Sequence, residues 1–163
     1  MDAVQIRPFV PTDRATVLQA LIALQNHEVP LHDSRLPGET TMERYLAELL
    51  RDLRDGSGII FIAEAAGVFV GCVACLVVEE QSVQETPDSN RHGYVSDIFV
   101  DPRCRSRGVA QLLLAAAERH LIGAGVTRLR INVLANNAEA RRAYERYGFT
   151  PYEVMYEKRI ARA

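Results

Sequence analysis

The chain has 163 residues and a formal net charge of -2 at pH 7, with 48% hydrophobic and 25% charged residues. Its length fits a single domain over residues 1–163, and its composition is that of an ordinary globular protein. A nearly neutral chain is not expected to bind nucleic acid, because such binding needs a strong excess of positive charge. The sequence shows no signal peptide and no apolar run that would span a bilayer, so we expect a cytoplasmic protein with no membrane partner.

The N-terminal part predicts an edge strand followed by two amphipathic helices. Residues 4–10 alternate apolar and polar side chains, and Pro8 favours a sheet edge because proline has no N–H to donate. Thr12 or Asp13 is the expected N-cap of the first helix. The sequence T-T-M-E at residues 40–43 has the spacing of a capping box and predicts the start of the second helix.

The loop predicted between these helices, residues 26–38, is a candidate cover for an active site. Its acidic side chains Glu28 and Asp33 are candidate contacts for a positively charged substrate, and a loop that is simply solvated is the alternative. Two histidines lie on either side of Glu28 in the pattern H-E-x-x-x-H. This pattern is one residue longer than the zinc-binding H-E-x-x-H, so we expect no metal site.

The middle of the chain predicts a hairpin, a polar connection and a central strand. The hairpin occupies residues 59–79, and its apolar second strand contains Cys72 and Cys75, which we expect to be free, buried thiols. Residues 79–93 form the most polar stretch and predict a mobile connection. The central strand follows at residues 94–100 and ends at an Asp-Pro pair.

An arginine-rich turn links this strand to the next helix and predicts an anion-binding site. Arg103, Arg105 and Arg107 precede Gly108, and an apolar stripe typical of a helix begins at Val109. The turn therefore combines fixed positive charge with the free N–H groups of a helix N-terminus. The missing Cβ of Gly108 leaves room for a phosphate to approach the backbone. A strand–helix connection with solvated arginines is the alternative.

The rest of the chain predicts three further elements. These are a strand at residues 129–134, a helix that ends at Gly148 and a closing strand at residues 153–160. The order of all predicted elements is β-α-α-β-β-β-α-β-α-β. This order predicts an α/β or α+β domain in which helices pack on a mixed sheet.

Two motifs resemble those of the GNAT superfamily of acyl-CoA-dependent N-acyltransferases. Residues 105–110, R-S-R-G-V-A, are similar to the family's Q/R-x-x-G-x-G/A loop. Residues 137–149, N-A-E-A-R-R-A-Y-E-R-Y-G-F, resemble its N-x-x-A-x-x-x-Y-E-x-x-G-F segment. The resemblance implies a mostly antiparallel central sheet with splayed central strands and helices on both faces.

The resemblance also implies that acetyl-CoA is the co-substrate and lies between the two splayed strands. Tyr144 matches the family's tyrosine near the CoA sulfur and is the candidate acid that protonates the departing thiolate. A tyrosine that only packs in the core is the alternative. The implied cofactor-binding residues are Ile98, Phe99, Val100, Arg105, Ser106, Arg107, Gly108, Val109, Ala110 and Asn137.

The sequence departs from some family members at the general base. Asn132 stands where ribosomal-protein N-terminal acetyltransferases have a glutamate, and an amide cannot accept a proton at neutral pH. The strand at residues 94–100 resembles the Y-L-E-D-I-Y-V strand of diamine acetyltransferases, with Ser96 at the position of the glutamate. Asp97 is the nearest carboxylate and a candidate catalytic residue, with a hydrogen-bonded structural carboxylate as the alternative.

These features predict an acetyl-CoA-dependent enzyme that transfers an acetyl group directly to a primary amine of a small molecule. The alternatives are an enzyme that acetylates a protein N-terminus or lysine, and a non-catalytic domain that senses acyl-CoA. The resemblance also implies a homodimer.

Overall fold

The computed structural model describes residues 3–55 and 57–160, and its centre is a five-stranded sheet with the order β1-β2-β3-β4-β5. Strands β1 to β4 pair antiparallel in sequence order, whereas β5 lies parallel to β4. The predicted mixed, mostly antiparallel sheet is therefore confirmed. Its strands are β1 (Val4–Pro8), β2 (Ile59–Ala65), β3 (Val68–Glu79), β4 (Arg91–Val100) and β5 (Leu129–Ile131).

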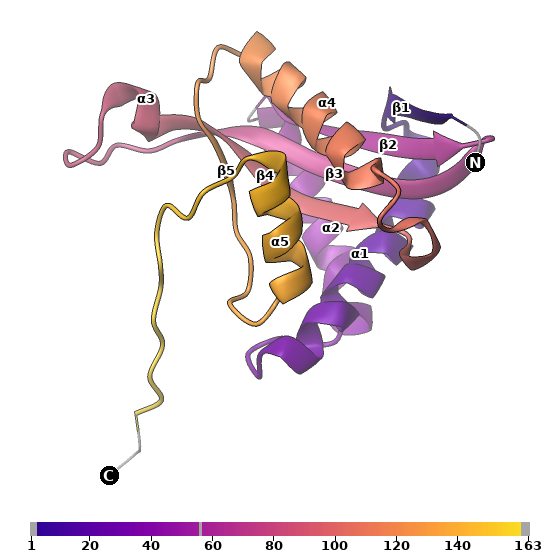
Figure 1. Cartoon of the computed structure of the whole chain (residues 1–163), viewed down its shortest axis with the longest axis horizontal. Coiled ribbons are helices and arrows are strands. Elements are labelled where there is room, and N and C mark those ends of the chain that lie inside the picture. The colour runs from indigo at the N-terminus through magenta and orange to yellow at the C-terminus, as the bar shows by residue number, and fades with distance from the viewer. Residues whose placement is uncertain (1–2, 56, 161–163) are drawn as a thin grey trace.

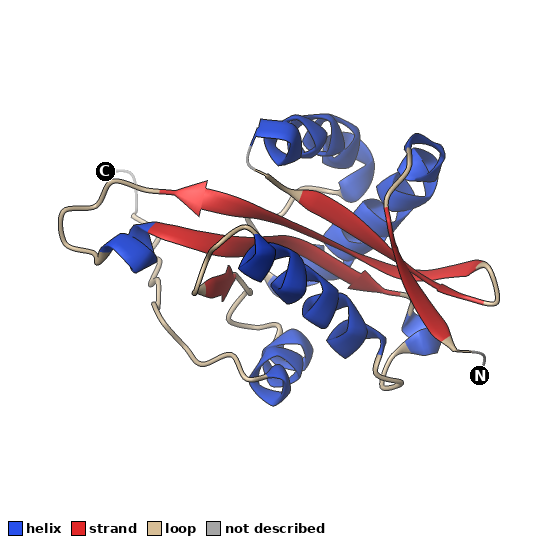
Figure 2. Ribbon diagram, turned by 90° about the horizontal axis from the view of Figure 1, so that it is seen from above, coloured by secondary structure: helices blue, strands red, loops and turns tan. Residues whose placement is uncertain are grey.

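Helices cover both faces of the sheet (Figures 1 and 2), as predicted. On one face α1 and α2 pack against Ile62 and Cys72, and on the other α4 packs against Val73 and Cys75. Both thiols are free and buried, as predicted, and burial raises the pKa of each to about 12. The helices are α1 (Arg14–Glu28), α2 (Gly38–Asp55), α3 (Pro87–Asn90), α4 (Val109–Gly123) and α5 (Ala138–Tyr147).

The N-cap of α1 is Asp13, one of the two predicted residues, but its side chain forms no cap hydrogen bond to the helix. Asp13 precedes α1 directly, but its carboxylate accepts hydrogen bonds from Arg7 of β1 at 2.7 and 2.8 Å. This pairing lowers the pKa of Asp13. The side chain therefore ties the first strand to the start of the helix and is not available to the helix N–H groups.

The start of α2 also differs from the prediction. The helix begins at Gly38, before the expected capping box at residues 40–43. Asn26 of α1 supplies the missing cap, because its Oδ1 accepts the Gly38 N–H at 2.8 Å. Since α1 continues past Asn26, the connection between the two helices is residues 29–37 and is shorter than the predicted loop at residues 26–38.

Two predicted segments near the central strand change their bounds. β4 begins at Arg91, because part of the polar stretch at residues 79–93 forms the short helix α3 and the start of the strand. β5 contains three residues, where a strand over residues 129–134 was expected. The pairing with β4 ends at Ile131, so the rest of the predicted strand has no neighbour on that side.

The closing strand predicted at residues 153–160 is absent, and this prediction is wrong. Residues 151–160 contain no helix or strand and are exposed along their whole length. Figure 1 shows the segment leaving the end of α5 and running away from the sheet. A strand needs a paired neighbour, and the segment finds none in the described part of its own chain. Among the described residues, no helix has the length and apolar composition needed to span a membrane.

Candidate active site

The pairing between β4 and β5 stops halfway along β4, and this divergence opens one side of the strand. Val95 and Ile131 are the last paired residues, and beyond them residues 97–100 of β4 pair only with β3. Among the described residues, the outward backbone groups of this stretch have no strand partner, so they can hydrogen-bond an extended ligand. The predicted cofactor-binding residues on this stretch are Ile98, Phe99 and Val100, all partly buried.

The loop that follows β4 places backbone N–H groups at the start of α4. Gly108 directly precedes the helix in a left-handed conformation with φ of 82°, and Ser106 has φ of 58°. A Cβ at Gly108 would meet no heavy atom within 4 Å, so the space in front of the helix is open. Val109 and Ala110 open the helix and present N–H groups at its positive end. This loop can bind a phosphate through its backbone.

The arginines of the loop differ in their partners. Arg105 forms an ion pair with Glu139 at 3.2 Å, which joins the loop to the first turn of α5. Arg103 binds Asp101 and holds the pKa of that carboxyl at about 2. Arg107 is exposed. Arg103 and Arg105 therefore already pair with carboxylates, and the backbone is the main candidate ligand for an anion.

Asp97 is a partly buried carboxylate on the divergent part of β4. Tyr45 of α2 donates a hydrogen bond from its hydroxyl to Oδ2 of Asp97 at 2.6 Å. Burial raises the pKa of Asp97, whereas hydrogen bonds from Tyr45 and Ser96 act to lower it, and the negative charge of Glu28 raises it further. The same burial raises the pKa of Tyr45. The carboxylate has neutral hydrogen-bond partners and is therefore able to attract a cation.

Tyr144 of α5 belongs to the same electrostatic neighbourhood. Its pKa is raised to about 12, first by burial and then by the charges of Glu28 and Asp97. Its hydroxyl is therefore protonated at neutral pH. Tyr94 also raises the pKa of Tyr144, and the side chain of Tyr94 hydrogen-bonds to Asn132. The fold thus brings Tyr144, Asp97 and Glu28 together from α5, β4 and α1.

Two other predicted residues have structural partners. Asp33 is exposed and forms an ion pair with Arg159. Asn137 is buried and caps α5, because its Oδ1 accepts the Ala140 N–H at 3.1 Å. Its amide nitrogen is the group that remains for a cofactor. Within the described ranges, no group of three or more potential metal ligands is found.

Tyr45 is the residue that the sequence analysis missed. It lies on the face of α2 that packs against the sheet, where its leucine neighbours indicate only a core position. Its partner Asp97 is 52 positions further along the chain. The one available signal was a tyrosine hydroxyl on an apolar face, which requires some polar partner but does not identify it.

Comparison with known proteins places most of this chain in one family. A family model described as Acetyltransferase (GNAT) family matches residues 21–149. A mycothiol acetyltransferase of Propionibacterium freudenreichii is 29% identical over 133 residues, covering 82% of this chain and 40% of the relative. One of Streptomyces bingchenggensis is 34% identical over 116 residues, covering 66% of this chain and 35% of the relative. The chain thus spans less than half the length of these curated relatives.

Solved structures share the fold at low sequence identity. A GCN5-related N-acetyltransferase from Ralstonia eutropha JMP134 has a TM-score of 0.77 at 22% identity, covering 96% of this chain and 98% of that one. AAC(6')-Iy, solved with the bisubstrate analog CoA-S-monomethyl-acetylneamine, has a TM-score of 0.74 at 23% identity, covering 98% of this chain and 100% of that one.

The open space in front of α4 gives a prediction for CoA binding. Gly108→Val fills this space, so we expect the Kd for CoA to rise at least about tenfold, a loss of about 1.4 kcal/mol. Gly125→Val is the matched control, because Gly125 also has positive φ, at 78°, but lies past the other end of α4. Both variants carry the same backbone strain, and calorimetry should show weak CoA binding only in the first. Equal affinities in the two variants would contradict the phosphate site.

The burial of Asp97 gives a prediction for stability. Because its pKa is raised in the folded state, its contribution to stability is full below the unfolded pKa and is lost as pH rises through the folded pKa. Asp97→Asn should therefore raise Tm at pH 7 relative to the parent chain, and this gain should disappear near pH 3.

Asp101→Asn is the control, for which we expect a change in Tm of the opposite sign. The pKa of Asp101 is lowered to about 2, so its stabilising contribution is present above about pH 4 and is lost as pH falls toward 2. This variant should lower Tm at pH 7. Thermal unfolding of both variants between pH 3 and 8 checks the pair, and a lower Tm for Asp97→Asn at pH 7 would show that the buried charge is well compensated.

Proposed function

Because this chain belongs to the GNAT family of acetyltransferases, we propose that it transfers the acetyl group of acetyl-CoA directly to the primary amine of a small, cationic molecule. The observation that carries the proposal is the partly buried cluster of Tyr144, Asp97 and Glu28 beside the divergence of β4 and β5. This cluster combines a hydrogen-bond donor with negative charge. It suits a reaction in which an amine attacks a thioester.

In the proposed complex, the donor follows the open side of β4. The pyrophosphate binds the N–H groups of residues 107–110, and the pantetheine amides bind the free backbone groups of residues 98–100. The open approach to Gly108 and the unpaired side of β4 support this placement. The CoA-containing ligand of AAC(6')-Iy, which has a similar fold, also supports it. Asn137 contributes through its amide nitrogen.

The transfer requires one bond to form and one to break. The neutral amine nitrogen attacks the carbonyl carbon, the C–S bond breaks, and its electron pair leaves with sulfur. The pKa of Tyr144 is raised to about 12, and a thiol has a pKa of about 8.5, so complete proton transfer to a free thiolate would cost roughly 5 kcal/mol. We therefore propose that Tyr144 donates a hydrogen bond to the developing thiolate. The thiolate's proton comes from the acetylated ammonium through water.

The proposed acceptor is cationic because the cluster is acidic. Asp97 is partly buried and accepts a hydrogen bond from neutral Tyr45, and Glu28, which forms an ion pair with Arg35 at 3.2 Å, still raises the pKa of Asp97 and of Tyr144. An ammonium group would neutralise this charge before it loses a proton to water. The relatives named as mycothiol acetyltransferases and the aminoglycoside acetyltransferase of similar fold support a small-molecule acceptor. Asp33, at the exposed end of the connecting loop, would attract the cation at longer range.

A protein N-terminus or lysine as acceptor is the second candidate function, and a non-catalytic acyl-CoA sensor is the third. The Tyr144 hydroxyl favours catalysis over sensing, because simple cofactor binding does not need a hydrogen-bond donor for a developing thiolate. A cytoplasmic location and a homodimer remain predictions from the sequence.

Tyr144→Phe should lower turnover while leaving CoA affinity nearly unchanged. The ring keeps its edge contact with Phe149, at 6.0 Å between centroids, and only the hydroxyl is lost. We expect kcat to fall roughly tenfold to a thousandfold, as for a lost hydrogen bond to a developing charge. Tyr147→Phe on the same helix is the control, because its hydroxyl binds Glu118 and not the cluster. Equal turnover in the two variants, with chemistry rate-limiting, would remove Tyr144 from the mechanism.

A panel of amines with acetyl-CoA, read by thiol release, tests the acceptor. We expect polyamine-like, aminoglycoside-like or amino-acid-derived amines to react and peptides not to. For an amine with pKa near ~10, the rate should rise roughly tenfold per pH unit until the neutral form or another step saturates. Turnover of N-terminal peptides alone would favour the protein acceptor, and CoA binding without turnover of any amine would favour the sensor.

A further inference from the structure

The connection between α1 and α2 places a cation against the cluster of the candidate active site. Arg35 lies in this connection, and its Nε is 3.2 Å from Oε2 of Glu28. Glu28 is the last residue of α1, and its charge raises the pKa of both Asp97 and Tyr144. The guanidinium of Arg35 therefore occupies a position to which a positively charged acceptor would be attracted.

Hydrogen bonds hold the backbone on both sides of Arg35. On one side, Nε2 of Gln25 donates to the carbonyl of Leu36 at 2.8 Å. On the other side, Nδ2 of Asn136 donates to the carbonyl of Leu31 at 3.0 Å. Gln25 belongs to α1, and Asn136 lies directly before the N-cap of α5. The two helices that supply Glu28 and the tyrosine of the cluster thus also fix the connection that carries the guanidinium.

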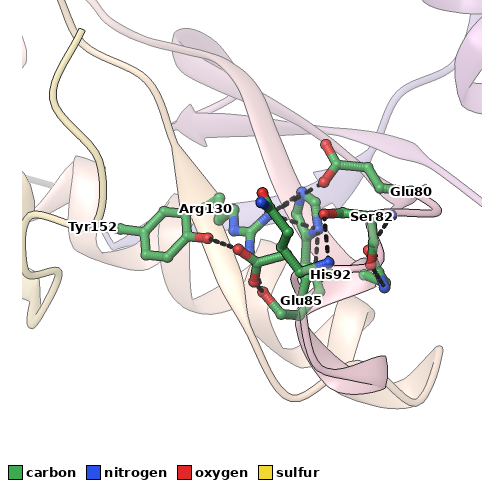
Figure 3. A network of polar contacts seen from close by, with 9 residues as sticks. Glu80, Ser82, Glu85, His92, Arg130 and Tyr152 are labelled. Atoms are coloured by element: carbon green, nitrogen blue, oxygen red, sulfur yellow. Dashed lines mark hydrogen bonds and ion pairs between the residues drawn. The ribbon is translucent and has the colours of Figure 1, made fainter.

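The side chain of Arg35 is held much less firmly than that of Arg130, the central arginine of a polar network (Figure 3). The guanidinium of Arg130 lies 3.1 Å from the His92 ring and 4.5 Å from the centroid of the Tyr152 ring, and its side chain is 19% exposed. Arg35 is 38% exposed, and among the described residues its one side-chain partner is Glu28. Ion pairs of this kind are weak, because water screens the charges. A cation from solution can therefore displace the guanidinium.

The transfer reaction limits which acceptors can replace Arg35. The nitrogen that attacks the acetyl group must be neutral, because a protonated amine has no lone pair to donate. A monoamine therefore carries no charge at the moment of attack, and the guanidinium must stay to balance Glu28. An acceptor with a second ammonium group keeps one positive charge after its reacting nitrogen has lost a proton. Such an acceptor balances Glu28 throughout the reaction.

We propose that Arg35 is a specificity-determining residue whose guanidinium holds the cation position beside Glu28 until an acceptor with two or more ammonium groups displaces it. This inference rests on the proposed function and narrows its substrate class to diamines and larger polycations. The reacting nitrogen of such an acceptor lies near Tyr144, and a second ammonium group takes the place of the guanidinium. An amine with a single ammonium group leaves Arg35 in place and gains nothing from the exchange.

Calorimetric binding of two matched ligands tests this assignment. The ligands are putrescine, a diamine, and γ-aminobutyrate, in which a carboxylate takes the place of the second amine. Both are titrated in the presence of CoA, which has no acetyl group to transfer. Arg35→Gln removes the competing cation, so the Kd of putrescine should fall at least about threefold. γ-Aminobutyrate should bind no more tightly to this variant than to the parent chain.

Arg14→Gln is the matched control. Arg14 is 41% exposed and also joins α1 to α2, through an ion pair with Glu43 at the other end of α1. Its loss changes the net charge by the same amount and should leave both Kd values unchanged. Circular dichroism checks that both variants are folded.

A higher Kd of putrescine in Arg35→Gln would show that Arg35 orients Glu28, and an unchanged Kd would show that Arg35 does not compete with the ligand. Either result would overturn the inference, as would putrescine that binds neither the parent chain nor the variant. The titrations do not depend on turnover. A chain that releases no thiol from acetyl-CoA with any amine would contradict the proposed function separately.

Discussion

The divergence of β4 from β5 is the constraint on which the rest of the structure depends. Gly93 to Val95 pair with Leu129 to Ile131, and then the two strands separate. Separation leaves the outward backbone groups of residues 97–100 without a strand partner among the described residues. If β4 and β5 paired along their whole length, hydrogen bonds between the two strands would satisfy these backbone groups. The opening thus converts an ordinary α/β core into a surface able to hold an extended ligand.

The cluster inside this opening is held at a cost to folding. Burial raises the pKa of Asp97, so its ionised form is less stable in the folded protein than in water. Tyr45 offsets part of this cost through one short hydrogen bond, and the nearby Glu28 adds to it. A structure selected only for stability would replace this carboxylate with a neutral or apolar group. Its presence at the divergent strand is the feature on which the proposed reactive site rests.

The sequence alone predicted those structural features that depend on residues close to one another along the chain. The end of β4 at an Asp-Pro pair, the glycine before α4 and the left-handed Gly148 after α5 are all local features, and each was predicted. The length of β5 was not, because it depends on where β4 turns away. The contact between Tyr45 and Asp97 also joins distant segments and left no local pattern. The prediction of a strand at residues 153–160 was wrong for a related reason. Alternation of apolar and polar side chains is a property of one segment, whereas a strand needs a second segment to pair with.

The cap that Asn26 gives to α2 has a consequence for how this protein can change. Its side chain accepts the Gly38 N–H and donates to Glu39, so the two ends of the connection at residues 29–37 are pinned by one residue. When both ends of a loop are fixed, the entropic cost of closing the loop rises slowly with its length, by about 0.6 kcal/mol for each doubling of the number of residues. Insertions and substitutions there would leave the helices in register. The proposed acceptor side of the opening can therefore diversify among homologues while the proposed cofactor side stays constant.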